Sequence, residues 1–415
     1  MSVVEDLVVA PSKADGDVAR AAADPPADSP GGIDLEFRAD IEGLRAVAVI
    51  LVVLYHAGVS WLPGGFVGVD VFFVISGFLI TGLLIREHEK RGRVSLPGFY
   101  ARRSRRILPA AMLVVTATVL LAHHYQNFVA YSNSATDSTV TDAKFATMFA
   151  ANIHFANIGT NYTDLGLPPS PLLHFWSLAV EEQFYVVWPT VVLVLGLLLR
   201  RWIRPTVLVA AAAATVASYI WAVHAVSVDA TAAFFSPFTR AWELGIGAVA
   251  ATVVIYAGRL NKWVGFALGW AGLVAIGLSA HYGGINFPGR NALLPVLGAV
   301  AVIIGGASGI GAGHLLALHP IRAVGRVSYG WYLLHYPPMI LIAGILWTGP
   351  LPVHERLLIS LVTLAIAFAM YFVIEKPIRR SRYLAARPWT SIAMGLALVA
   401  SAFAVISLYH KGLFG

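Results

Sequence analysis

The stretch Leu44-Arg-Ala-Val-Ala-Val-Ile-Leu-Val-Val-Leu-Tyr-His56 decides the fold class of this chain. The apolar run that contains it continues to residue 61 and, as a helix, is long enough to cross about 30 Å of hydrocarbon. Ten more such runs follow, and the eleven lie at residues 44–61, 67–85, 107–122, 172–199, 205–226, 240–257, 263–280, 291–309, 326–347, 356–374 and 388–408. Because helices satisfy their own backbone polar groups inside a bilayer, the pattern predicts an all-α integral membrane protein.

The composition excludes other broad classes of protein. Of the 415 residues, 58% are hydrophobic and 12% are charged, whereas soluble globular chains are about 45–50% apolar and about 25% charged. The sequence has no cysteine, which rules out disulfide scaffolds, thiolate metal sites and cysteine nucleophiles. No acidic or histidine cluster has the spacing of metal ligands. We expect neither a bound metal nor a nucleic-acid partner.

The charged residues predict how the chain is oriented in the membrane. Residues 1–36 are rich in Ala, Asp, Pro and Ser without an apolar run, so we expect a disordered tail. Twenty of the 29 Lys and Arg residues fall in five connections on the side of that tail. The positive-inside rule then predicts a cytoplasmic N-terminus and, after eleven spans, an extracytoplasmic C-terminus.

This layout divides the chain into three segments. A cytoplasmic tail at residues 1–36 precedes a membrane domain at residues 37–380, and residues 381–415 hold an extra transmembrane helix with a short outside tail. The longest outside connection, residues 123–171, is polar and ends in a Pro-rich run. We expect it to form a folded flap that returns to the membrane.

Two ionisable residues share the first apolar run. Ionisable groups inside a bilayer are costly and are treated as functional by default. Eleven residues separate Arg45 from His56, or roughly 16 Å along a helix. With Arg45 at the cytoplasmic edge, His56 would lie near the middle of the bilayer. A lone histidine there would more often only bond a neighbouring helix, but other charged residues accompany this one.

A cluster of arginines precedes the third run. Arg102-Arg-Ser-Arg-Arg106 places four arginines in five residues. Guanidinium groups match phosphate oxygens, so Arg102, Arg103 and Arg106 are candidates for binding a phosphate-rich cytosolic ligand. The alternative is a positive-inside anchor that binds anionic lipid, and this segment alone does not separate the two.

Adjacent glutamates enter the fourth run in His174-Phe-Trp-Ser-Leu-Ala-Val-Glu-Glu-Gln-Phe-Tyr185. Neighbours on a helix point about 100° apart, so at most one of Glu181 and Glu182 should face the cavity that His56 faces. There it would orient the imidazole as a base. The alternative is a salt bridge between helices to Arg240 or Arg45.

Further polar residues stand alone in apolar runs and are expected to line or support one cavity. They are Asp70, Ser76, Trp176, Arg240, Glu243, His335 and Glu375. Because Arg240 and Glu243 are three residues apart on a helix, they can also simply pair with each other.

Taken together, these segments resemble the acyltransferase-3 family of bacterial membrane O-acyltransferases over residues 38–380. Six motifs carry the resemblance: Asp40-Ile-Glu-Gly-Leu-Arg45 with His56, Gly68-Val-Asp-Val-Phe-Phe-Val-Ile-Ser-Gly77, Arg102-Arg-Ser-Arg-Arg-Ile-Leu-Pro109, the segment from His174 to Tyr185, Ser328-Tyr-Gly-Trp-Tyr-Leu-Leu-His335 and Glu375-Lys-Pro377. The resemblance implies a ten-helix acyltransferase bundle, to which this chain adds an eleventh, C-terminal transmembrane helix.

The resemblance also implies an activity and a set of site residues. An acyl group, usually acetyl, would pass from cytosolic acyl-coenzyme A to a hydroxyl of an envelope carbohydrate or glycolipid on the outer face of the bacterial inner membrane. His56 matches the essential histidine of the family and Arg45 its partner arginine. Arg102, Arg103 and Arg106 match its cytoplasmic arginine motif, and Glu181 with Glu182 matches its acidic pair. His56 would act as a base or carry the acyl group itself.

One departure and two other functions stay open. Many family members continue into an outside hydrolase-like domain, whereas this sequence stops at Gly415. We therefore expect acyl transfer to the acceptor within the membrane domain, in the 123–171 flap or on a partner among envelope-biosynthesis or export proteins. A transporter or flippase of an envelope glycolipid precursor, or a lipid-binding scaffold, would use the same charges differently.

Overall fold

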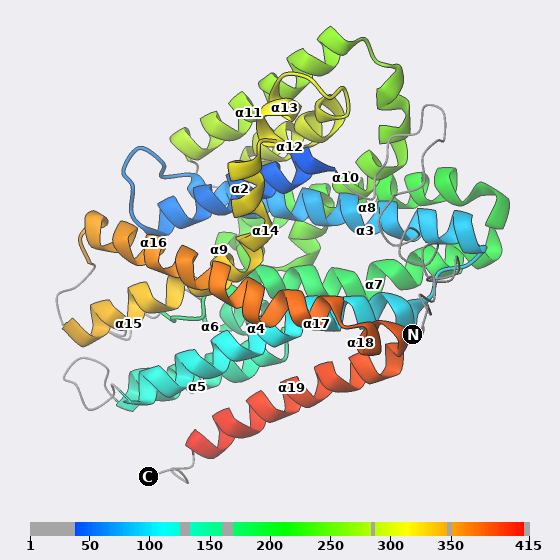
Figure 1. Cartoon of the computed structure of the whole chain (residues 1–415). Coiled ribbons are helices and arrows are strands. Elements are labelled where there is room, and N and C mark those ends of the chain that lie inside the picture. Colours follow the sequence, from blue (N-terminus) through cyan, green and yellow to red (C-terminus); the bar gives the residue numbers. More distant parts are fainter. Residues whose placement is uncertain (1–37, 125–132, 160–168, 284–286, 347–350, 411–415) are drawn as a thin grey trace, which may run out of the picture. The chain divides into compact units, whose positions relative to one another are not determined.

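The computed structural model describes residues 38–124, 133–159, 169–283, 287–346 and 351–410. Within these ranges every regular element is a helix (Figure 1). The tail expected at residues 1–36 lies outside the described residues, as do residues 125–132 and 160–168 of the expected flap and the last five residues of the chain.

Eight helices in the described ranges are long and apolar enough to cross a membrane. They are built on α3 (Gly68–Arg91), α4 (Leu96–His124), α7 (Phe175–Leu198), α8 (Ile203–Val228), α10 (Pro237–Val253), α11 (Lys262–Tyr282), α16 (Val353–Met370) and α19 (Pro388–His410). The prediction of an all-α integral membrane protein is therefore confirmed.

The other three predicted runs are also helical, but each departs from a simple span. Helix α2 (Ala39–His56) carries Asp40, Glu42 and Arg45 in its first two turns. Helix α12 (Leu293–Gly306) has 14 residues. The run at residues 326–347 is divided between α14 (His319–Leu334) and α15 (Tyr336–Leu346).

Shorter elements connect these helices. They are η1 (Gly65–Val67), α5 (Asn133–Thr147), α6 (Ala151–Ile158), η2 (Arg200–Trp202), α9 (Ala230–Phe235), η3 (Val254–Arg259), η4 (Arg290–Ala292), α13 (Ala312–Leu316), the π-helical η5 (Tyr371–Glu375), α17 (Lys376–Arg380) and α18 (Arg382–Ala386). In the described part of the expected flap, α5 packs against α4 and α19, and α6 packs against α7 and α9.

The helices pack in pairs that can be followed in Figure 1. Helix α10 packs against α3 and α8, α11 against α12, and α4 against α19. Helix α14 lies along α2. Small residues let membrane helices approach closely: a side chain at Gly77 would meet the backbone of Leu244, and one at Gly325 would meet the backbone of Glu42. These contacts bring α3 against α10 and α14 against α2.

Helices α2 and α14 lie side by side and connect the two ends of the candidate site. We call this pair of helices the α2–α14 wall. Arg322 binds Glu42 at the start of α2, Arg45 binds Ser328, and His335 follows the end of α14 next to His56. Partners that are later in α2 are also later in α14, so the two helices run in the same direction.

Candidate active site

Three histidines gather where α14 ends. The Nδ1 atom of His56 lies 2.9 Å from Nε2 of His335, and Nδ1 of His335 lies 2.7 Å from the carbonyl oxygen of Tyr332. The His174 ring contacts the His335 ring, with 5.5 Å between ring centres. His174 and His335 are buried and His56 is half-buried. We call these three residues the histidine cluster.

The break between α14 and α15 supplies carbonyl groups to this cluster. A proline has no backbone N–H, so it cannot bond the carbonyl four residues before it. Pro337 therefore leaves the carbonyl of Leu333 without its usual helical partner, and Nε2 of His174 donates to it at 3.1 Å. Two consecutive prolines, Pro337 and Pro338, thus end α14 where the imidazoles need acceptors.

The hydrogen bonds of the cluster fix which nitrogen of His56 carries a proton. A carbonyl oxygen can only accept, so Nδ1 of His335 must carry the hydrogen that it shares with Tyr332. In a neutral ring the other nitrogen, Nε2, is then an acceptor. It receives its hydrogen from Nδ1 of His56, which leaves Nε2 of a neutral His56 with a free electron pair.

His56 lies at the end of its helix rather than in its middle. Helix α2 has 18 residues, or about 27 Å. It begins six residues before Arg45 and ends at His56. The spacing between the two residues is as expected, but the helix starts earlier than the hydropathy pattern indicated, because Asp40 is buried in an ion pair with Arg38.

Glu181 and Glu182 do not orient His56. Glu181 accepts from Ser76 Oγ at 2.5 Å and from the Tyr185 hydroxyl. The Arg103 guanidinium lies 3.8 Å from Glu181 and 3.6 Å from Glu182 and stacks on the Tyr185 ring. The expectation that one glutamate orients the His56 imidazole is corrected here, because the hydrogen-bond partner of that ring is His335. The alternative expectation was a salt bridge from these glutamates to Arg240 or Arg45, but their ion-pair partner is Arg103.

A cavity lies beside Glu181 and Glu182. It has a volume of about 80 Å³, and we call it the inner cavity. Its polar lining comprises Arg45, Ser76, Arg103, Arg106, Ser177, Glu181, Glu182, Tyr185, Ser328, Tyr329 and Tyr332. Arg45, Arg106 and Tyr329 also line a second hollow of about 380 Å³, which we call the basic mouth. The two spaces are therefore neighbours that share three side chains.

A tyrosine separates the inner cavity from the histidine cluster. Ser177 Oγ and the Tyr332 hydroxyl are 2.6 Å apart, and the Tyr332 hydroxyl donates to the carbonyl of His174. Tyr332 and Ser177 line the inner cavity, whereas His56 and His335 are absent from its lining in the described part of the chain. We call Tyr332 with Ser177 the tyrosine barrier.

Comparison with known proteins assigns the family. The profile of a family described as an acyltransferase domain matches residues 38–372. The chain belongs to this acyltransferase-3 family. The family expected from the six motifs is confirmed.

Two curated relatives show how far the similarity extends. The chain is 30% identical over 361 residues to the peptidoglycan O-acetyltransferase OatA of Listeria monocytogenes, a match that covers 83% of this chain and 56% of the relative. It is 29% identical over 366 residues to the O-acetyltransferase OatA of Staphylococcus aureus, covering 83% and 57%. The chain thus spans little more than half the length of these relatives. No solved structure matches it.

The arginine motif of this acyltransferase domain does not form one patch. Arg102 pairs with Glu87 at 3.0 Å and Arg103 with the two glutamates, whereas Arg105 donates to the carbonyl of Leu384. Successive residues of a helix point about 100° apart, so the guanidinium groups on α4 contact different residues. Of the residues predicted to bind acyl-coenzyme A, Arg45 and Arg106 line both spaces, Arg103 lines only the inner cavity, and Arg102 lines neither.

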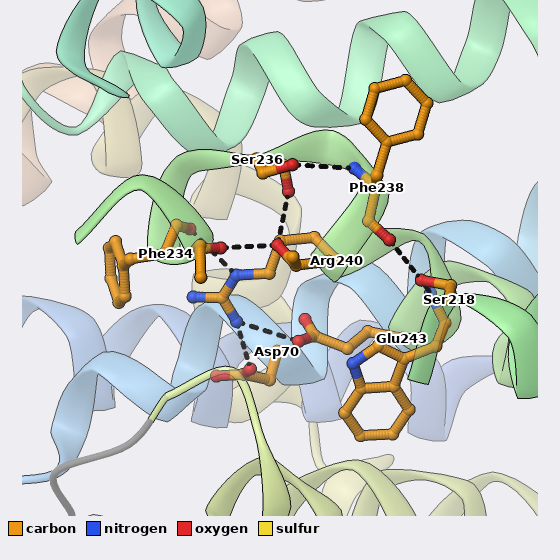
Figure 2. A network of polar contacts seen from close by, with 10 residues as sticks. Asp70, Ser218, Phe234, Ser236, Phe238, Arg240 and Glu243 are labelled. Atoms are coloured by element: carbon orange, nitrogen blue, oxygen red, sulfur yellow. Dashed lines mark hydrogen bonds and ion pairs between the residues drawn. The ribbon is translucent and has the colours of Figure 1, made fainter. Parts of the chain in front are cut away.

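Three residues predicted to line or support the cavity form a separate polar core (Figure 2). The Arg240 guanidinium donates to Asp70 at 2.8 Å and to Glu243 at 2.9 Å, and all three side chains are buried. The Trp176 ring lies 5.1 Å from that guanidinium. The expectation of a cavity lining is corrected for Asp70, Trp176, Arg240 and Glu243, which line neither the inner cavity nor the basic mouth, whereas their supporting role stays a prediction. The alternative pairing of Arg240 with Glu243 is confirmed, with Asp70 as a third member.

The remaining predicted residues lie in the candidate site, and some residues of the site were not predicted. Ser76 lines the inner cavity, Glu375 lines the basic mouth, and His335 belongs to the histidine cluster. Site residues without a predicted role are His174, Tyr332, Arg322, Arg326, Lys376, Arg379 and Arg380. The proline pair after His335 was the sequence signal for the break that His174 uses.

Proposed function

We propose that this chain is an O-acyltransferase that moves an acyl group, usually acetyl, from a coenzyme A thioester to a hydroxyl of a cell-envelope carbohydrate. Membership of the acyltransferase family supports the reaction type. The names of the relatives, a peptidoglycan O-acetyltransferase and an O-acetyltransferase, support acetyl as the group and a cell-wall carbohydrate as the acceptor class.

The observation that carries the proposal is the hydrogen-bond chain from His56 through His335 to the Tyr332 carbonyl. The free electron pair on Nε2 of His56 takes the proton of the acceptor hydroxyl as its oxygen attacks the thioester carbonyl. The carbon–sulfur bond then breaks, and the sulfur leaves with that proton as a thiol. Atoms and charges balance without a metal or a redox partner. The same tautomer would serve if the ring carried the acyl group.

The donor and the acceptor would approach from opposite ends of the α2–α14 wall. We propose that the basic mouth faces the cytoplasm and that the histidine cluster lies toward the outer face. The excess of Lys and Arg in the connections on the tail's side supports this orientation. The donor thioester would pass the tyrosine barrier, whereas the half-buried His56 is reached by the acceptor from the other side.

Replacing His56 tests the proposal directly. The purified full chain, reconstituted with labelled acetyl-coenzyme A and peptidoglycan fragments, should form acetyl esters, and His56→Ala should lower the rate by about 100-fold or more. His224→Ala is the matched control, because His224 is exposed on α8 and lines neither cavity. Full transfer by His56→Ala would refute the assignment. A chain that neither binds acetyl-coenzyme A nor forms esters would favour the transporter.

A further inference from the structure

The basic mouth is built mainly by residues outside the arginine motif. Three of its lining residues come from α2 and α4, and the rest come from α14, η5 and α17. They are Glu42, Arg45, Arg106, His319, Arg322, Gly325, Arg326, Tyr329, Tyr371, Phe372, Glu375, Lys376, Arg379 and Arg380. Seven of these are Lys or Arg and two are Glu, so the hollow carries a strong excess of positive charge.

Helix geometry explains why these basic side chains converge. Residues three or four apart share a face of a helix, which places His319, Arg322 and Arg326 on one side of α14. On the opposite side of the basic mouth, the π-helical turn η5 leads directly into α17, which carries Lys376, Arg379 and Arg380. Such turns are rare and occur frequently at functional sites.

The acids of the mouth do not neutralise this charge. Glu42 accepts from Arg322 at 3.0 Å and lies 3.9 Å from Arg326, so one carboxylate serves two guanidinium groups. Arg379 and Arg380 are exposed at the rim. Guanidinium groups at such a rim match phosphate oxygens in charge and in geometry.

The shape of the site distinguishes between sources of phosphate. The mouth, at about 380 Å³, meets the inner cavity of about 80 Å³, whose apolar lining includes Phe72, Ile75 and Leu79. A ligand with a bulky polyanionic end and one slender, uncharged arm fits this arrangement, with its charged end in the mouth and its arm in the inner cavity. A membrane lipid, whose two acyl chains belong in the bilayer, would leave the inner cavity without an occupant.

We propose that the basic mouth binds the phosphates of the donor's nucleotide end, an adenosine 3′,5′-bisphosphate group, through Arg322, Arg326, Lys376, Arg379 and Arg380. This assignment rests on the proposed function and moves the phosphate site from the arginine motif to α14 and α17. Arg45 and Arg106, at the border of both spaces, then contact the point where the arm enters the inner cavity.

Binding of adenosine 3′,5′-bisphosphate to the full chain in uncharged detergent tests the site. Calorimetry should show that the double variant Arg379→Gln/Arg380→Gln binds this probe about 10- to 100-fold more weakly. The matched control Arg382→Gln/Arg387→Gln removes two charges from the neighbouring segment, which does not line the mouth, and should bind within about twofold of the parent. Equal weakening in both variants, or none in the first, would overturn the proposal.

A donor without phosphates separates this proposal from the proposed function. S-acetyl-N-acetylcysteamine has the thioester but no nucleotide, so the mouth variant should use it at the parent rate, which also shows that the variant is folded. If neither thioester yields esters, the proposed function fails. The binding of adenosine 3′,5′-bisphosphate still tests whether the basic mouth is a phosphate site. If the mouth variant loses retention of phosphatidylglycerol in nanodiscs but keeps the bisphosphate, the mouth is a lipid headgroup site and the proposal is overturned.

Discussion

At the scale of single residues, the proposed role of His56 as a base depends on the acceptor nitrogen of His335. The two rings are 2.9 Å apart, and His335 is fully buried. His335→Ala removes the acceptor, so His56 can turn or take the other tautomer, and kcat should fall by about 100-fold. His335→Gln offers a side-chain oxygen in the same region and should recover part of that loss. Equal losses in both variants, measured with labelled acetyl-coenzyme A, would mean that His335 only fills space.

The buried Asp70–Arg240–Glu243 core predicts an asymmetry in stability. One guanidinium serves two carboxyl groups, and one oxygen of each carboxyl has no hydrogen-bond partner within the described structure. Arg240→Gln leaves both acids buried without a cation, which should cost about 3–5 kcal/mol. Glu243→Gln removes surplus negative charge and offers an amide N–H to Asp70.

Thermal unfolding in detergent checks this order. The unfolding temperature of Arg240→Gln should lie well below that of the parent, whereas that of Glu243→Gln should stay close to it or rise. The opposite ranking would show that the two acids do not need the arginine as their buried cation.

Residue types were more predictable than residue partners. The sequence identified Glu181 and Glu182 as charges in an apolar run, which are visible without coordinates, and Arg103 as one of the clustered arginines before the third run. Their mutual pairing was not predictable, since it depends on the rotation of α4 and α7 about their axes. Hydropathy does not determine that rotation. For the same reason, the four clustered arginines could not be assigned to separate neighbours.

At the scale of elements, the break between α14 and α15 organises the histidine cluster. Pro337→Ala restores a backbone N–H that can bond the Leu333 carbonyl, and this N–H would compete with His174 for it. Helix stability should be unchanged or improved, since alanine is the better helix former. Acyl transfer should nevertheless fall by about tenfold or more, because His174 loses its acceptor and its contact with the His335 ring is disturbed. Pro352→Ala is the control, since Pro352 precedes α16 and lies outside the cluster. Parent-like transfer by Pro337→Ala would show that the break is not required.

Element positions followed from the sequence wherever hydrophobicity alone determined them. All eleven apolar runs contain helices, and eight of these helices are long and apolar enough to cross a membrane. The start of α2 was placed too late, because Asp40 and Glu42 look like residues outside a membrane until their partners Arg38 and Arg322 are known. The break at His335 was not visible in the hydropathy pattern, because two prolines lower the mean hydropathy of a long apolar run only slightly.

At the scale of the whole molecule, the parallel helices α2 and α14 link the basic mouth to the histidine cluster. Arg45 and Ser328 bond near the mouth, and His56 and His335 bond at the cluster. Tyr332, one turn before His335 on α14, closes the path between the two ends. A protein that holds a soluble donor on one side and a carbohydrate acceptor on the other needs such a barrier, since an open path would leak ions and hydrolyse the thioester.

This arrangement requires that the mouth and the cluster face opposite sides of the membrane. The chain has no cysteine, so single introduced cysteines report on exposure to a membrane-impermeant maleimide without background. Lys90→Cys, near the end of α3, should react only after the cells are opened, because we expect that end on the cytoplasmic side. Asp229→Cys, between α8 and α9, should react in spheroplasts whose membrane is intact. Both positions are exposed, so a lack of reaction reports on sidedness rather than burial. If Lys90→Cys reacts in intact spheroplasts and Asp229→Cys does not, the orientation is inverted, and the basic mouth cannot receive a cytosolic thioester.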